Sequence, residues 1–151
     1  MSENMILALL VGAGATYLLA SCIWWVLQVV ANWKIFDKAG EAGWKSIIPF
    51  YSGYISYKIA WNPMFFWISL ITGCAASGLN AYYEETNGSP VMIFIALALL
   101  IISIVINVKF CVKLSKAFGK GMGFAFGLLI LNPLFILILG LGKSEYVGNQ
   151  S

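Results

Sequence analysis

The sequence predicts an all-α integral membrane protein with four transmembrane helices and an interfacial aromatic segment between the first and the second. Of its 151 residues, 61% are hydrophobic and only 10% are charged, whereas a soluble domain carries about 25% charged residues. No Asp, Glu or Lys occurs in four long runs, 4–33, 59–83, 86–108 and 121–142. Each run exceeds the roughly 20 residues with which a helix crosses a hydrocarbon core. Helices satisfy all their backbone polar groups internally, so they are the expected way to cross it.

The spans leave little length for anything else, so we expect a single membrane domain over residues 1–151. Its spans are expected at about 5–33, 63–83, 90–108 and 121–142, and its connections at 34–62 and 109–120. The first helix is expected to continue past the membrane interface to Lys38. Gly40 and Gly43 follow it, and glycine is common just after the end of a helix.

Two dipeptides mark where helices begin. Asn62-Pro63 and Ser89-Pro90 each combine a capping side chain with proline at the first helical position, so the second and third helices are expected to start there. The third is expected to continue to about Phe118. Lys38-Ala39-Gly40 is echoed by Lys116-Ala117-Phe118-Gly119, which leaves open whether the halves are a duplicated hairpin or merely similar.

The distribution of lysine predicts the orientation of the chain. Eight of the nine Lys lie in the connections 34–62 and 109–120, and only Lys143 follows the last span. Loops rich in Lys stay on the cytoplasmic side of a membrane. A multi-pass protein with both termini outside is therefore expected.

Aromatic side chains dominate the first connection. Tryptophan and tyrosine concentrate at membrane–water interfaces, so five of these residues are expected to anchor the chain there: Trp33, Trp44, Tyr51, Tyr54 and Trp61. The same segment could instead line a gate or an inner vestibule.

Six lysines are candidates for binding anionic lipid. Lys109, Lys113, Lys116 and Lys120 are spaced by 4, 3 and 4 residues, which places them on one side of a helix. Lys34 and Lys38 end the first helix in the same way. A lysine beside an anionic surface contributes about 1 kcal/mol of binding free energy. The alternative is that these lysines only determine topology.

Several kinds of chemistry have no residues to support them. There is no His and no Arg, which removes the usual general base and the bidentate phosphate clamps. The three Cys lie singly on three different helices, and no span contains a carboxylate or Lys of the kind that proton-coupled carriers use. We therefore expect no enzyme activity, no cofactor, no metal site and no nucleic-acid partner.

Neutral polar residues remain inside the spans. Four of them could line a pore or a pocket: Asn132, Pro133, Asn107 and Asn80. Pro133 stands near the middle of 121–142, where proline frees a backbone carbonyl and kinks a helix. This kink could line a path for a small solute or serve packing alone.

Residues 30–146 resemble a family of small bacterial membrane proteins of unknown function. The motifs that carry the resemblance are Trp33-Lys34-Ile35-Phe36, Lys38-Ala39-Gly40, Gly43-Trp44, Ile48-Pro49-Phe50-Tyr51 and Lys58-Ile59-Ala60, then the run from Leu114 to Phe124 and Gly140-Leu141-Gly142 before Tyr146. The resemblance implies a bacterial inner-membrane location and no mechanism.

Members of that family often carry the label "signal peptidase I", and the residues argue against it. Such enzymes need a nucleophilic Ser and a desolvated Lys on a folded external domain. Here only Lys143 and Ser144 would lie outside, on a short tail. The expected function is a non-catalytic membrane module that binds anionic lipid or a partner membrane protein, as an oligomer. The alternative is an oligomeric pore or carrier for a small solute, with Asn132 and Pro133 along its path.

Overall fold

The computed structural model describes residues 3–86 and 89–150, which are helical and contain no strand. Its helices are α1 (Glu3–Lys38), the 3-10 helix η1 (Gly43–Ile47), α2 (Pro49–Ala60), α3 (Met64–Thr86), α4 (Pro90–Ala117), α5 (Met122–Ile130) and α6 (Asn132–Leu141). Three stretches are long and apolar enough to cross a membrane, Val11–Lys38, Met64–Tyr83 and Pro90–Ala117. The all-α class is therefore confirmed.

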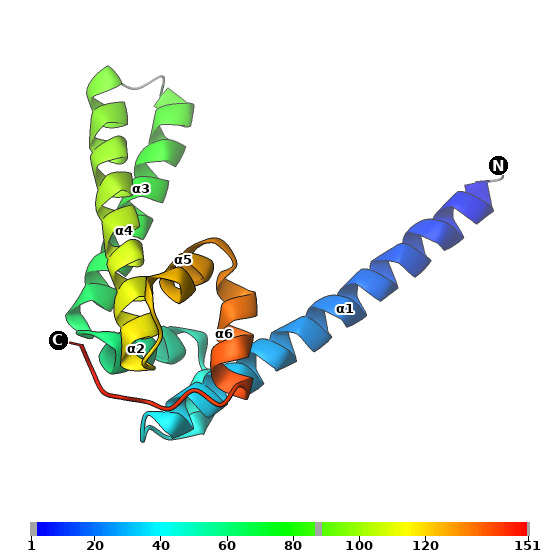
Figure 1. Ribbon diagram of the computed structural model, residues 1–151. Coiled ribbons are helices and arrows are strands. Elements are labelled where there is room, and N and C mark those ends of the chain that lie inside the picture. Colours follow the sequence, from blue (N-terminus) through cyan, green and yellow to red (C-terminus); the bar gives the residue numbers. More distant parts are fainter. Residues whose placement is uncertain (1–2, 87–88, 151) are drawn as a thin grey trace.

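The helices gather at the end of the molecule where α1 and α4 terminate (Figure 1). α3 and α4 form an antiparallel hairpin, and α1 diverges from it. The hydrophobic core lies at the gathered end, and its buried side chains are Ile35, Phe36, Ile55, Ile59, Ala60, Cys111, Leu114, Ala117, Phe118, Leu128 and Leu139. Residues 11–27 of α1 are all exposed in the isolated chain.

The predicted helix starts are confirmed by their caps. The Asn62 side-chain oxygen accepts a hydrogen bond from the Met64 backbone N–H at 2.9 Å, one residue after Pro63. The Ser89 hydroxyl accepts from the Val91 N–H at 3.4 Å, with Pro90 in the first turn. Both caps satisfy N–H groups that a helix start leaves without a partner.

α1 and α4 end in the same way. Gly40 and Gly119 have φ angles of +76° and +63°, a conformation that glycine adopts without steric cost. The Glu41 N–H then donates to the Phe36 carbonyl, and the Lys120 N–H to the Ser115 carbonyl, each at 2.9 Å. These are Schellman motifs, and they stop α1 at Lys38 as the sequence predicts.

The expected fourth span, 121–142, is not one continuous helix, and a fourth span is not confirmed. The chain leaves helical geometry at Leu131, with φ −117° and ψ 47°, and α6 begins directly afterwards with Asn132 and Pro133. Pro133 has no N–H and its ring would collide with the preceding turn, so a continuous helix is broken there. With nine and ten residues, α5 and α6 are about 14 and 15 Å long, half of a hydrocarbon core of about 30 Å.

The chain also reverses direction between α5 and α6 (Figure 1). Gln28 of α1 contacts Pro133 at the start of α6, and Lys38 contacts Leu139 and Gly142 at its end. α6 therefore runs in the same direction as α1, toward the gathered end from which the chain left α4. Segment 118–142 begins and finishes on one face of the molecule.

The position of the C-terminal tail follows from this reversal. Residues 144–150 contact the ends of α2 and α4, which belong to the connections 34–62 and 109–120. The sequence predicts the tail on the opposite face, because it counts 121–142 as a full crossing. In the structure the tail lies at the same end of the molecule as these two connections, and the side of the membrane that this end faces stays a prediction.

Candidate functional site

All nine lysines lie on the face where four helices end. α1, α2, α4 and α6 each finish there with a C-terminus, which carries the negative end of the helix dipole and carbonyls without a helical partner. The lysines of this basic face are Lys34, Lys38, Lys45, Lys58, Lys109, Lys113, Lys116, Lys120 and Lys143. Cations near helix C-termini are electrostatically favourable, so part of this charge serves the fold.

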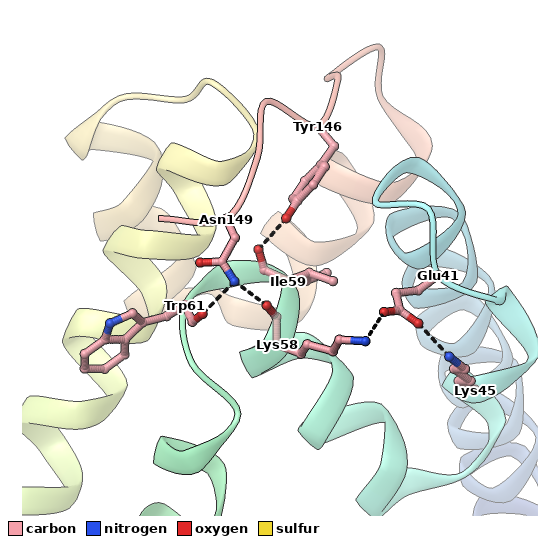
Figure 2. A network of polar contacts seen from close by, with 7 residues as sticks. All are labelled: Glu41, Lys45, Lys58, Ile59, Trp61, Tyr146 and Asn149. Atoms are coloured by element: carbon pink, nitrogen blue, oxygen red, sulfur yellow. Dashed lines mark hydrogen bonds and ion pairs between the residues drawn. The ribbon is translucent and has the colours of Figure 1, made fainter. Parts of the chain in front are cut away.

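Glu41 is the acid at the centre of the ion pairs on this face (Figure 2). Its carboxylate accepts hydrogen bonds from the ammonium groups of Lys45 at 2.5 Å and Lys58 at 2.6 Å. These bonds join the turn after α1 to η1 and to the last turn of α2. They also hold the pKa of Glu41 below its ordinary value and raise the pKa of Lys58.

The stability that Glu41 contributes is expected to depend on pH. A carboxyl with a lowered pKa stabilises the fold above its unfolded value, near 4.5, and this contribution disappears as the pH falls through the lowered value. Lys58 contributes below its unfolded value of 10.5 and loses that contribution at higher pH. At pH 7 we expect Glu41→Gln to cost about 1 kcal/mol, because Lys58 is half exposed and screened, or about 2–4 °C in Tm.

Thermal melting in detergent from pH 7 to pH 3 measures this effect. The difference between wild type and Glu41→Gln should shrink as Glu41 protonates. Glu145→Gln is the matched control, because Glu145 is exposed and makes no ion pair in the part of the chain that the structure describes. A difference that stays constant over this pH range would contradict the assigned role.

The C-terminal tail supplies hydrogen bonds to the open ends of two helices. The Tyr146 hydroxyl donates to the Ile59 carbonyl at 2.8 Å, and the Val147 N–H donates to the Ala117 carbonyl at 2.7 Å. The Asn149 amide donates to the carbonyls of Lys58 and Trp61, at 2.5 and 2.6 Å (Figure 2). The tail thus satisfies carbonyls that α2 and α4 would otherwise leave open.

Lys38 does the same for α6. Its ammonium donates to the carbonyls of Leu139 at 2.8 Å and Gly142 at 2.7 Å. The buried Ser144 hydroxyl also donates to the Leu139 carbonyl, at 3.0 Å. The Lys38 side chain therefore secures the end of α6 against α1.

Of the six lysines predicted to bind lipid, two donate hydrogen bonds inside the protein, and the ammonium group of a third, Lys109, lies 6.0 Å from the centroid of the Trp61 ring. Lys38 caps α6, and Lys113 donates to the Gln150 carbonyl. Among the described residues, five lysines of the basic face make no side-chain hydrogen bond or ion pair: Lys34, Lys109, Lys116, Lys120 and Lys143. All five are exposed. These are the cations that the face offers to a ligand.

The predicted anchor residues differ in their exposure. Trp33, Trp44 and Tyr51 are exposed, and Tyr54 and Trp61 are partly buried. Tyr51 stacks between Trp44 and Tyr54, with ring centroids 6.4 and 6.2 Å away. Together with Ile48, Phe50, Phe66 and Trp67, Tyr51 and Tyr54 line an aromatic groove of about 640 Å³.

The four residues predicted to line a pore are not brought together. Asn132 faces a pocket of about 220 Å³ that Gln28 and Asn32 also line, and the Gln28 amide donates to the Pro133 carbonyl at 3.0 Å. The Asn107 side-chain oxygen accepts a hydrogen bond from the Cys111 thiol. Asn80 lines a separate crevice between α3 and α4. The polar residues that do line one pocket together are Gln28, Asn32, Ser56, Tyr57 and Asn132.

Sequence reasoning missed the residues that organise the basic face. Glu41 could have been found, because it is the only acid between Lys38 and Tyr83 and stands among lysines. Tyr146 and Asn149 gave no signal, because their partners are backbone carbonyls about 90 residues away. Gln28 likewise reaches its partner across 105 residues.

The fold and the basic face together define a helical protein with three candidate membrane spans and a lysine-rich end. The chain belongs to the Family of unknown function (DUF5684), whose model matches residues 44–149. The match starts at η1 and includes the tail, and it agrees with the resemblance to a family of unknown function seen in the sequence. No curated protein matches the chain significantly, and no solved structure does.

Proposed function

We propose that this protein is a non-catalytic membrane module that binds anionic phospholipid through its basic face. In this proposal α1, α3 and α4 cross the cytoplasmic membrane of a bacterium. α5 and α6 enter it from the basic side and return to the same side. The N-terminus then lies outside and the C-terminus inside, and all nine lysines obey the positive-inside rule.

The observation that carries the proposal is the group of five exposed lysines whose ammonium groups make no hydrogen bond or ion pair with any residue that the structure describes. Lysines that served only to complement helix ends would be engaged with carbonyls, as Lys38 and Lys113 are. Five exposed ammonium groups on one face complement a surface of anionic headgroups. At about 1 kcal/mol for each lysine near such a surface, their combined contribution is substantial.

Lipid-dependent stability tests the proposal. A ligand that binds the native state raises its stability, so phosphatidylglycerol added to the protein in detergent should raise the Tm by several degrees more than phosphatidylcholine does. Replacing the five free lysines by Gln should abolish that preference, and replacing them by Arg should retain it, because Arg keeps the charge. An equal response of the wild type to both lipids would overturn the proposal.

A further inference from the structure

A pocket of about 420 Å³ opens on the basic face beside the end of α6. Its lining residues are Lys38, Gly142, Lys143, Ser144, Glu145 and Tyr146. Two of its polar groups are already engaged, because Ser144 donates to the Leu139 carbonyl and Tyr146 to the Ile59 carbonyl. The groups left to meet a ligand are the ammonium groups and Glu145.

Lys38 is held in this pocket by the backbone of α6. Two of its three ammonium hydrogens are directed to the carbonyls of Leu139 and Gly142. The third has no acceptor among the described residues. A cation fixed in this way loses little side-chain entropy when a ligand binds.

Positive charges outnumber negative ones around Lys38. Lys34 stands one turn earlier on α1, at a separation that places both side chains on one side of the helix. Lys34 and Lys120 both lie close enough to repel the Lys38 ammonium, and no carboxylate is among the charges that act on it. Lys143 adds a further cation on the lining, against the single acid Glu145. Crowded like charges raise the energy of the free protein, and an anion would lower it.

We propose that this pocket binds the phosphate group of an anionic phospholipid headgroup or of a soluble phosphate. The inference rests on the proposed function and assigns one defined site within the basic face. The unused hydrogen of Lys38 would bond a phosphate oxygen, and Lys34, Lys120 and Lys143 would complement its charge. Because Lys38 also caps α6, an occupied pocket would hold α6 more firmly against α1.

Two matched double variants test the site. Lys143→Gln with Lys120→Gln removes one lysine of the pocket lining and a second lysine whose charge acts on Lys38, and Lys109→Gln with Lys116→Gln removes two exposed cations of the same face on α4. Native mass spectrometry of the detergent-held protein, titrated with phosphatidylglycerol, counts the bound lipids. We expect one tightly held lipid in the wild type and in the α4 variant, and an affinity about tenfold weaker in the pocket variant. Arg at positions 120 and 143 should restore it.

The outcomes separate this inference from the proposed function. Equal weakening by both variants would overturn the defined site and leave the basic face as a diffuse lipid-binding surface. No preference of the wild type for phosphatidylglycerol over phosphatidylcholine would overturn the proposed function, and if inorganic phosphate also fails to raise the Tm, the pocket proposal is overturned with it. Inorganic phosphate, measured by its effect on Tm, distinguishes the sources of the ligand. If it protects the wild type but not the pocket variant, and phosphatidylglycerol adds nothing, the site takes a soluble phosphate.

Discussion

Gly140→Ala is expected to destabilise the protein by about 1–3 kcal/mol, or about 2–4 °C in Tm for each kcal/mol. A Cβ atom at position 140 would lie 2.4 Å from the Ala31 carbonyl oxygen and 2.8 Å from the Ala31 Cα atom. Both are backbone atoms of α1, and Ala31 is fully buried, so no side-chain movement can relieve the collision. The variant must push α6 away from α1.

Gly123→Ala on α5 is the control for this experiment. A Cβ atom at position 123 meets nothing within 4 Å, and alanine is about 1 kcal/mol more favourable than glycine inside a helix. Its Tm should stay unchanged or rise. If both variants melt like the wild type in detergent, α6 does not pack on the backbone of α1.

The second large effect is expected in cysteine labelling, which is all-or-none and reports the side of the membrane that the tail occupies. Single cysteines introduced as Lys116→Cys and Glu145→Cys should react with a membrane-impermeant maleimide from the same side, because segment 118–142 returns to the face that it leaves. Both positions are exposed. In intact cells neither should be labelled, and permeabilisation should expose both.

Two further chains make the labelling interpretable. The unaltered protein is the blank for its own cysteines, Cys22, Cys74 and Cys111. Asn87→Cys, in the turn that the sequence places outside, should react in intact cells. Labelling of Glu145→Cys from outside together with Lys116→Cys from inside would restore a single crossing by 121–142.

The ends of the long helices could be predicted because local residues determine them. Asn62 and Ser89 cap their helices with their own side chains, and Gly40 and Gly119 supply the left-handed turn after α1 and α4. Segment 121–142 has the length and hydropathy of a span, and a count of apolar residues cannot distinguish one crossing from two half-length helices. The reversal depends on contacts of α6 with Gln28, Ala31 and Lys38, about 100 residues away.

The residue types of the candidate site could be predicted from the sequence, but its hydrogen bonds could not. Lysine spacing indicates basic surfaces at the ends of α1 and α4, and the structure adds the lysines of η1, α2 and the tail to the same face. The spacing does not indicate that Lys38 and Lys113 donate hydrogen bonds to backbone carbonyls. Nor does it indicate that Lys34 and Lys120 make no hydrogen bond among the described residues. That division is decided by where α6 and the tail end in space.

The paired half-length helices have a consequence for how the protein is made. α1, α3 and α4 are each long enough to enter the bilayer as independent helices, whereas α5 and α6 are too short to be stable there alone. Their contacts with α1 close loops of about 100 residues, which is slow because the entropy of loop closure must be overcome first. Insertion of the three long helices and packing of α5 and α6 against α1 are therefore expected to be separate steps, with a partly assembled intermediate between them. In that intermediate the spans are already inserted, but the carbonyls at the end of α6 have not yet received the hydrogen bonds from Lys38. We expect the intermediate to be more susceptible to membrane proteases than the folded protein.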